Sequence, residues 1–431
     1  MGKFISLGEY NKQYKYIWIY LVIRFIYLFI FANNLVFKQI ETEVVKLPYG
    51  PFIYPQFDFA ACIIIPSVLK IIPKCFKKKE SIQDLIGDEL IYNERDIIKE
   101  FGVERSDYFL FINIFLVVIK DLFNETTYKF KCLFFNFWMF EMLYYELFHS
   151  KYFKTKINKH HICSLIFILS LCSVLKIIQI ILSFIYDTDE AKFFEKRMWI
   201  IPVALFVYFL YRVFRAFTMC NEKYYFEKRY ITIINYIFLY GLYGLITTLI
   251  GGIISTYVPC GDKTIPELSQ VVCDYVENNQ TYYFDSYKIF FTKLHNDEYF
   301  ISKLILLIVK SILNFVKIYY IYVIYQKLSP IYYICMHRFD TLLVTILDII
   351  NKLVNDEIEG INITLQFFDI IILIFYILGS IVYLEFIELN YCNLQFYTKR
   401  NIKKRSNTEV MISLDEISES SDLVSKENDE S

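Results

Sequence analysis

Three polar side chains at helical spacing stand out in an apolar stretch of the chain. Lys310, Asn314 and Lys317 are separated by four and three residues, so a helix places all three in one narrow stripe. A charge near the centre of a bilayer costs about 2.5 to 3.5 kcal/mol on insertion scales and therefore needs a partner or water. Because ammonium groups bind anionic oxygens, the stripe indicates a site for an anionic solute.

The next apolar stretch carries a second polar stripe. His337 and Thr341 are four residues apart, and Asp348 follows on the same helical face. Because only residues 326–330 separate the two stretches, we expect them to form an antiparallel hairpin. Two interpretations remain open here: the stripes line a hydrated binding site, or Lys310 pairs with Asp348 and no ligand is involved.

Other ionisable residues also fall in apolar stretches. We expect Glu141 to hydrogen-bond the rest of the solute, and Arg24 and Arg212 to tune the electrostatic potential of the cavity. The alternative is that these residues form internal ion pairs that hold the helices in register. Further ionisable or polar residues in such stretches are Asp58, Glu146, Lys176 and Gln179.

Signatures of catalysis and of cofactor binding are missing from the sequence. The ten cysteines form no CxxC pair, and the adjacent His160 and His161 have no acidic residue at metal-ligand spacing. No glycine-rich phosphate loop or nucleophile elbow is present. The formal net charge of −1 gives no overall field that would attract nucleic acid. We therefore expect neither an enzyme nor a resident cofactor or metal.

The distribution of apolar residues predicts a membrane protein and excludes a soluble globular enzyme. Ile231–Val258 contains no charged residue in 28 positions, which exceeds the roughly 20 residues that cross a bilayer. The expected fold is an all-α polytopic bundle of about ten transmembrane helices. Its predicted spans are 16–37, 51–73, 107–121, 131–148, 162–186, 197–217, 230–257, 300–325, 331–353 and 367–387, of which the third is short and could be re-entrant.

The orientation of these spans follows from the basic residues in the loops. With a cytosolic N-terminus, the cytosolic segments hold 23 Lys and Arg and the opposite segments hold 12. An excess of basic residues is typical of cytosolic loops. Both termini are therefore predicted to be cytosolic.

Three Asn-x-Thr sequons agree with this orientation, since glycosylation takes place on the lumenal or extracellular side. They lie at Asn124, Asn279 and Asn362, all in loops that the charge count places outside. The loop at 258–299 also holds Cys260 and Cys273, thirteen residues apart. In an oxidising lumen these two residues either close a disulfide or remain free thiols.

The span count divides the chain into two halves of five helices each. Residues 1–15 form a cytosolic N-terminus, and residues 16–186 form the first half. Residues 197–387 form the second half, with the lumenal loop 258–299 inside it. Two five-helix halves enter the membrane from opposite sides, as in the inverted repeats of many transporters. Residues 388–431 are predicted to be a cytosolic, mostly disordered acidic tail.

Short segments spread over most of residues 1–405 resemble the drug/metabolite transporter superfamily, and within it uncharacterised protist-type members of the solute carrier 35, or nucleotide-sugar transporter-like, family. The similar segments are Phe137–Glu141 with the basic turn Lys154–His161, Lys223–Tyr224, Tyr240–Gly244, the turn Lys327–Pro330 and Tyr383–Asn390. The chain departs from the family in having only 12 glycines, where average usage of about 7% predicts near 30.

The resemblance implies a secondary transporter that moves a small anionic solute, such as a nucleotide sugar or a phosphorylated metabolite, by alternating access. It also implies a glycoprotein of the Golgi or endoplasmic reticulum membrane rather than the plasma membrane. The expected partners are the lipid bilayer, the small-molecule substrate and a second copy of the chain in a homodimer. The alternative is a non-transporting scaffold or receptor that uses the lumenal loop and the cytosolic tail for partner binding.

Overall fold

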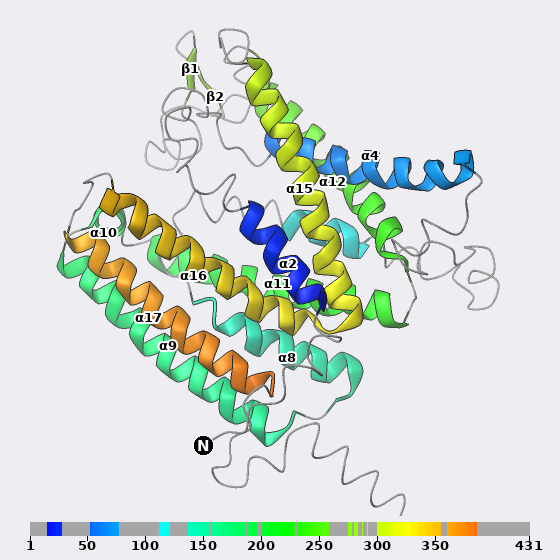
Figure 1. Ribbon diagram of the computed structural model, residues 1–431. Helices are drawn as coiled ribbons and strands as arrows, with labels where there is room; N and C mark the ends of the chain where they lie inside the picture. Colours follow the sequence, from blue (N-terminus) through cyan, green and yellow to red (C-terminus); the bar gives the residue numbers. More distant parts are fainter. Residues whose placement is uncertain are drawn as a thin grey trace, which may run out of the picture.

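The chain folds into a bundle of long α-helices with one short β-hairpin (Figure 1). The computed structural model describes residues 15–27, 52–76, 110, 112–120, 137–155, 157–186, 188–195, 198, 200–228, 231–257, 275–277, 280–282, 287, 291, 300–354 and 360–385. The hairpin pairs β1 (Tyr275–Glu277) with β2 (Gln280–Tyr282) in antiparallel register, with Tyr275 opposite Tyr282.

Among the described residues, five helices are long and apolar enough to cross a membrane, and they identify an integral multi-pass membrane protein. They are α9 (Lys159–Ile185), α11 (Ile200–Lys228), α12 (Ile233–Tyr257), α15 (Phe300–Lys327) and α17 (Gly360–Tyr383). All five coincide with predicted spans. The helix α11 continues eleven residues beyond the predicted end at residue 217, because the polar residues that follow include no Gly or Pro to stop it.

The remaining helices are shorter or more polar. They are α2 (Lys15–Tyr27), α4 (Ile53–Phe76), α8 (Phe140–Phe153), α10 (Asp189–Glu195), α16 (Pro330–Val354) and an unlabelled helical segment at 112–120. The predicted span 131–148 differs from α8, since residues 137–139 form a turn and the helix continues to Phe153. Apolar composition does not distinguish a turn from a helix in such surroundings.

Helix packing divides the bundle into two groups. In the first, α17 packs against α9 and α16, while α8 packs against α11; in the second, α4 packs against α12, and α15 packs against α2 and α4. Glycines allow close approach in both groups. A Cβ at Gly244 would overlap the Phe59 ring of α4, and a Cβ at Gly379 would overlap Ile168 of α9.

The turn between α15 and α16 joins the two groups. Only Leu328 and Ser329 separate the helices, and Pro330 opens α16 at a position where its missing N–H costs nothing. The two helices meet at this turn and then run apart (Figure 1). α16 packs mainly against α17, whereas α15 packs mainly against α2 and α4. The predicted hairpin is therefore confirmed at its turn but opens away from it.

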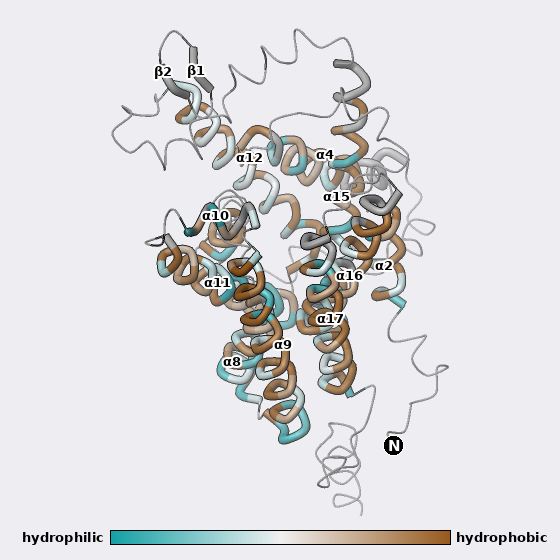
Figure 2. The backbone as a smooth tube through the Cα atoms, turned by 90° about the vertical axis from the view of Figure 1, so that its left-hand side faces the viewer, coloured by the Kyte–Doolittle hydropathy of each residue, from teal (hydrophilic) through white to brown (hydrophobic). Residues whose placement is uncertain are grey.

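The outer surfaces of the long helices are apolar. Figure 2 shows hydrophobic residues along most of α9, α12 and α17. Large apolar side chains on these helices are exposed, among them Ile166, Ile250 and Leu378. A soluble protein rarely leaves such a continuous surface uncovered, and lipid chains are the partner that suits it.

Candidate functional site

The most deeply buried charged residue of the bundle that the structure describes lies at the start of α8. The Glu141 side chain is 0% exposed and accepts contacts from three arginines. Its Oε2 lies 2.7 Å from Nη1 of Arg212 and 3.3 Å from Nη2 of Arg338, and its Oε1 lies 3.0 Å from Nε of Arg215. We call these four residues the arginine centre.

Three helices bring the arginine centre together. Arg212 and Arg215 are three residues apart on α11 and share one face, which packs against Glu141 of α8. Arg338 comes from α16, where it lies eight residues after the proline that opens the helix. The site therefore depends on the packing of α8, α11 and α16, and no single stretch of sequence contains it.

Aromatic rings surround the guanidinium groups. The Arg338 guanidinium lies 4.6 Å from the centroid of the Trp138 ring, and that of Arg212 lies 4.8 Å from the Tyr208 ring. Arg212 Nε also donates a 2.6 Å hydrogen bond to the Tyr208 hydroxyl. Stacking on aromatic faces stabilises guanidinium groups in a dry environment better than it would an ammonium group.

The charges of the arginine centre do not balance. Three guanidinium groups and one carboxylate sum formally to +2, since arginine stays protonated in proteins. Arg338 has the weakest contact with Glu141, at 3.3 Å. It is 4% exposed, and its Nε has no hydrogen-bond partner among the described residues. This centre therefore has spare capacity to donate to an anion.

The structure brings two of the predicted site residues, Glu141 and Arg212, into direct contact. His337 lies beside them, interacting electrostatically with Glu141 while its ring stacks on Tyr333. Thr341 instead donates to the backbone carbonyl of His337 at 3.0 Å, within its own helix. Neither Arg215 nor Arg338 is among the site residues predicted from the sequence.

Arg24 lies near the arginine centre, but the described residues show no ion pair between Arg24 and Glu141. It interacts electrostatically with the Tyr333 hydroxyl, which also interacts with Arg215. The Tyr333 ring packs edge-on against Tyr20 of α2 at 5.9 Å. Arg24 is therefore a neighbour of the arginine centre, reached through Tyr333.

The predicted lysine stripe lies elsewhere in the bundle, between α15 and α4. Lys310 and Lys317 interact electrostatically with Asp58 of α4, and the Asn314 side chain interacts with the same carboxyl group. We call these four residues the lysine centre. The alternative partner Asp348 has a side chain outside the described ones, so that pairing stays a prediction.

A third polar cluster contains a buried carboxyl group that the sequence analysis did not select. Glu222 of α11 is 2% exposed. Its Oε1 accepts hydrogen bonds from the hydroxyls of Tyr322, at 3.1 Å, and Tyr236, at 3.3 Å. Asn113 donates to the Tyr236 hydroxyl at 3.2 Å. We call these four residues the tyrosine centre.

A signal for this cluster was present in the sequence. Arg212, Arg215 and Glu222 lie at offsets of three and ten residues, which place them on one face of a helix.

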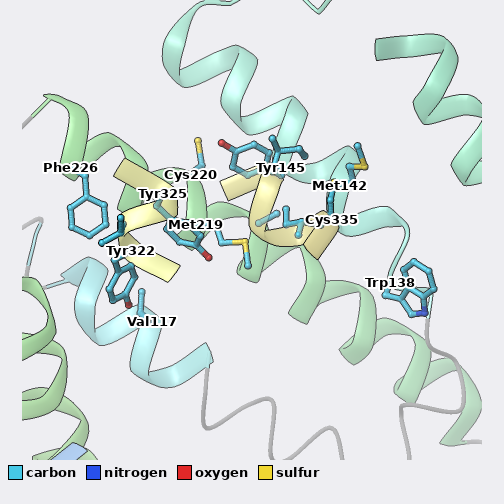
Figure 3. Close-up of a cluster of buried hydrophobic side chains, with 14 of the residues drawn as sticks. Val117, Trp138, Met142, Tyr145, Met219, Cys220, Phe226, Tyr322, Tyr325 and Cys335 are labelled. Atoms are coloured by element: carbon cyan, nitrogen blue, oxygen red, sulfur yellow. The ribbon is translucent and has the colours of Figure 1, made fainter. Parts of the chain in front are cut away.

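Hydrophobic residues fill the space between the arginine and tyrosine centres. Figure 3 shows Met219, Cys335 and Met142 between Trp138 on one side and Tyr322 and Phe226 on the other.

Several predicted positions lie outside the described residues. These are the disulfide candidates Cys260 and Cys273 and the sequons at Asn124 and Asn279. The third sequon, at Asn362, lies in the first turn of α17, and its side chain is not described. The segments 1–14 and 386–431 and most of the loop 258–299 are likewise outside the described residues.

The described residues contain no group of three or more His, Cys, Asp or Glu that could hold a metal ion. His160 and His161 are buried, with both residues at most 3% exposed. His161 Nε2 lies 3.2 Å from Oε1 of Glu385, and the His161 ring stacks on the Tyr383 ring. These two contacts connect the start of α9 to the end of α17.

Comparison with known proteins adds no relative to these observations. No protein-family model matches the chain, and no curated protein matches it either. Its function must therefore be argued from the geometry described above.

Proposed function

We propose that this protein is a secondary carrier, not an enzyme, and that it moves a small anionic solute across an endomembrane by alternating access. The observation that carries the proposal is the buried guanidinium of Arg338, which shares an already occupied carboxylate and keeps an unpartnered Nε. A buried cation with unused donors is costly inside a membrane protein. A solute with two or more anionic oxygens would satisfy those donors.

The three arginines differ in how a solute can reach them. Arg212 and Arg215 hold Glu141 at 2.7 and 3.0 Å, whereas Arg338 lies at 3.3 Å. The solute is therefore expected to engage Arg338 first, because breaking the longest contact costs least. The Trp138 ring beside Arg338 offers a flat apolar surface to a ring on the solute.

The finer features of the proposal rest on the sequence. These are ten spans in a 5+5 inverted repeat, a nucleotide sugar or phosphorylated metabolite as solute, and a Golgi or endoplasmic reticulum location. The five long apolar helices support a multi-pass bundle that such a carrier requires. Lys310 and Lys317, which interact with Asp58, would form a second polar binding site along the solute path.

Counterflow in proteoliposomes tests the proposal. Vesicles preloaded with one unlabelled solute would be offered labelled phosphate, glucose 6-phosphate, a nucleoside monophosphate or a nucleotide sugar. We expect accumulation of at least one of these anions. Arg338→Gln should weaken its apparent affinity by about tenfold or more, as expected for the loss of a charge-assisted pair.

The matched control is Lys151→Gln, which removes a positive charge from an exposed position near the end of α8. It should leave counterflow unchanged. The proposal fails if the folded wild-type protein shows no counterflow with any anion of the panel, or if Arg338→Gln behaves like the Lys151 control.

One observation favours the alternative of a non-transporting scaffold. Glu141 is fully enclosed by its three arginine partners, and a closed cluster of this kind holds α8, α11 and α16 together without any ligand. A scaffold of this kind predicts that Arg338→Gln lowers stability and that wild-type vesicles show no counterflow. The same experiment therefore separates the two functions.

A further inference from the structure

Among the buried glutamates of the described residues, Glu141 and Glu222 have partners that differ in chemistry. The partners of Glu141 in its ion pairs are guanidinium groups, which donate hydrogen bonds and never accept them. Glu222 accepts hydrogen bonds from two tyrosine hydroxyls, and a hydroxyl can both donate and accept. The two carboxyl groups therefore respond differently to a proton.

A proton on Glu141 would place an O–H group against three donors and remove the only negative charge of the arginine centre. If Glu222 is protonated, its O–H group can donate to the oxygen of one tyrosine hydroxyl. The other tyrosine hydroxyl can still donate to a lone pair of the carboxyl group. The tyrosine centre thus keeps its hydrogen bonds in either protonation state, because Tyr236 and Tyr322 can rotate their hydroxyl hydrogens.

Groups from α11 itself and from three other elements surround the carboxyl group of Glu222. Tyr236 comes from α12, Tyr322 and Tyr325 from α15, and Asn113 reaches Tyr236 from the segment 112–120. Tyr325 interacts electrostatically with both Glu222 and Arg215.

On α11 itself, Lys223 and Tyr225 follow Glu222 closely in the sequence. The Tyr225 hydroxyl interacts with that of Tyr236. The Lys223 ammonium is directed to Glu227, at 2.7 Å, and to the carbonyl of Leu328, at 3.0 Å.

We propose that Glu222 is a proton-binding site, and that its protonation strengthens anion binding at the arginine centre. The first part stands on the tyrosine centre alone, whereas the second rests on the proposed function. The carrier would then move a proton and an anion together, because each favours the binding of the other.

Geometry gives the sign and size of this coupling. Glu222 follows Arg215 by seven residues on α11, two helical turns or about 10 Å along the axis. A negative charge at that distance repels an incoming anion, and a proton removes it. At an effective dielectric constant of about 20, the change corresponds to roughly tenfold in anion affinity.

Infrared spectroscopy of the full-length protein in lipid tests the proton site directly. In a series of spectra at different pH values, the wild-type protein should show a carboxyl band whose intensity changes with pH and that Glu222→Gln removes. Glu146→Gln, which changes another buried carboxyl group, should leave that band in place. An identical pH response in wild type and Glu222→Gln would overturn the proposal.

A second variant tests the proton site independently, in case Glu222→Gln does not fold. Tyr322→Phe removes one hydrogen bond and keeps the ring, which packs edge-on against Tyr236 at 5.1 Å. The band should persist in this variant with a displaced titration midpoint. An unchanged midpoint would show that the tyrosine contact has no part in proton binding and would count against the site.

Sulfate binding tests the coupling, because sulfate keeps its charge over this pH range. The wild-type protein should bind sulfate about tenfold more tightly near pH 5 than near pH 8. In Glu222→Gln only the smaller pH dependence contributed by His337 should remain. His337 also faces the arginine centre, and its contribution remains in the variant, so the difference isolates Glu222.

The two experiments fail separately. If wild-type protein binds no sulfate at either pH, the anion site of the proposed function is wrong, while the infrared titration still decides the proton site. If sulfate binds but Glu222→Gln keeps the pH dependence of wild type, the coupling is wrong and the anion site stands.

Discussion

The arginine and lysine centres both place charged side chains inside an apolar bundle, but their charged groups differ in burial and in flexibility. At the arginine centre the carboxylate of Glu141 is fully buried, and rigid guanidinium forks hold it from two helices. At the lysine centre Asp58, Lys310 and Lys317 are only partly buried, and the lysines have flexible stems. Arginine suits a fixed, dry contact, whereas lysine keeps its hydration and adapts its position.

This difference assigns different roles to the two regions. A fully buried cluster with directed contacts holds the helices in register, and under the proposed function it would also select one anion geometry. A partly buried cluster with flexible side chains can rearrange at a lower cost than a fully buried one. Substitutions that exchange or remove these properties should therefore act unequally at the two centres.

The largest effect is expected from Glu141→Gln. This change leaves three buried guanidinium groups without a carboxylate, and breaking a buried ion pair in this way costs about 3–5 kcal/mol of stability. Thermal unfolding in detergent measures it. Glu227→Gln is the control, since Glu227 is 34% exposed in its pair with Lys223 and should cost less than about 1 kcal/mol. Equal losses in the two variants would contradict the difference in burial.

The second prediction compares two arginines of the same centre. Arg212→Met removes the 2.7 Å contact with Glu141 and the hydrogen bond to Tyr208, so it should destabilise the protein by about 2–3 kcal/mol. Arg338→Met removes the longest contact and reduces the formal excess charge, so it should cost less than about 1 kcal/mol. A larger loss for Arg338→Met would make Arg338 a structural residue and weaken the case for an anion site.

A packing change can test whether the lysine centre depends on the position of α4. A Cβ at Gly241 would lie 2.9 Å from the backbone oxygen of Phe59, so α4 must shift to accommodate Gly241→Ala. Overpacking of this kind costs about 1–2 kcal/mol. Because Asp58 precedes Phe59, the shift should also weaken its contact with Lys310, and the arginine centre should be unaffected. Sulfate binding that stays at the wild-type level, with a lowered unfolding midpoint, is the expected combination.

The ease of prediction also differs between the two centres. The lysine stripe lies within one helix, so its period is readable from Lys310 to Lys317, although its partner Asp58 is not. The arginine centre joins residues 71 and 197 positions apart, and nothing local in the sequence relates Glu141 to Arg338. Long apolar runs predicted α9 and α12 well, because crossing a bilayer requires such runs. The end of α11 was missed because the apolar run ends before the helix does.

The smallest effect is expected from Asp58→Asn. The amide keeps a hydrogen-bonding group toward Asn314, while the partly exposed Lys310 and Lys317 can turn toward water, so stability should fall by no more than about 1 kcal/mol. The formal charge of the lysine centre nevertheless rises from +1 to +2, which should favour an anion passing it. Counterflow rates at low ionic strength should therefore increase, and added salt should reduce the gain. A loss of stability as large as that of Glu141→Gln would mean that Asp58 is as tightly enclosed as Glu141, and the contrast between the two centres would disappear.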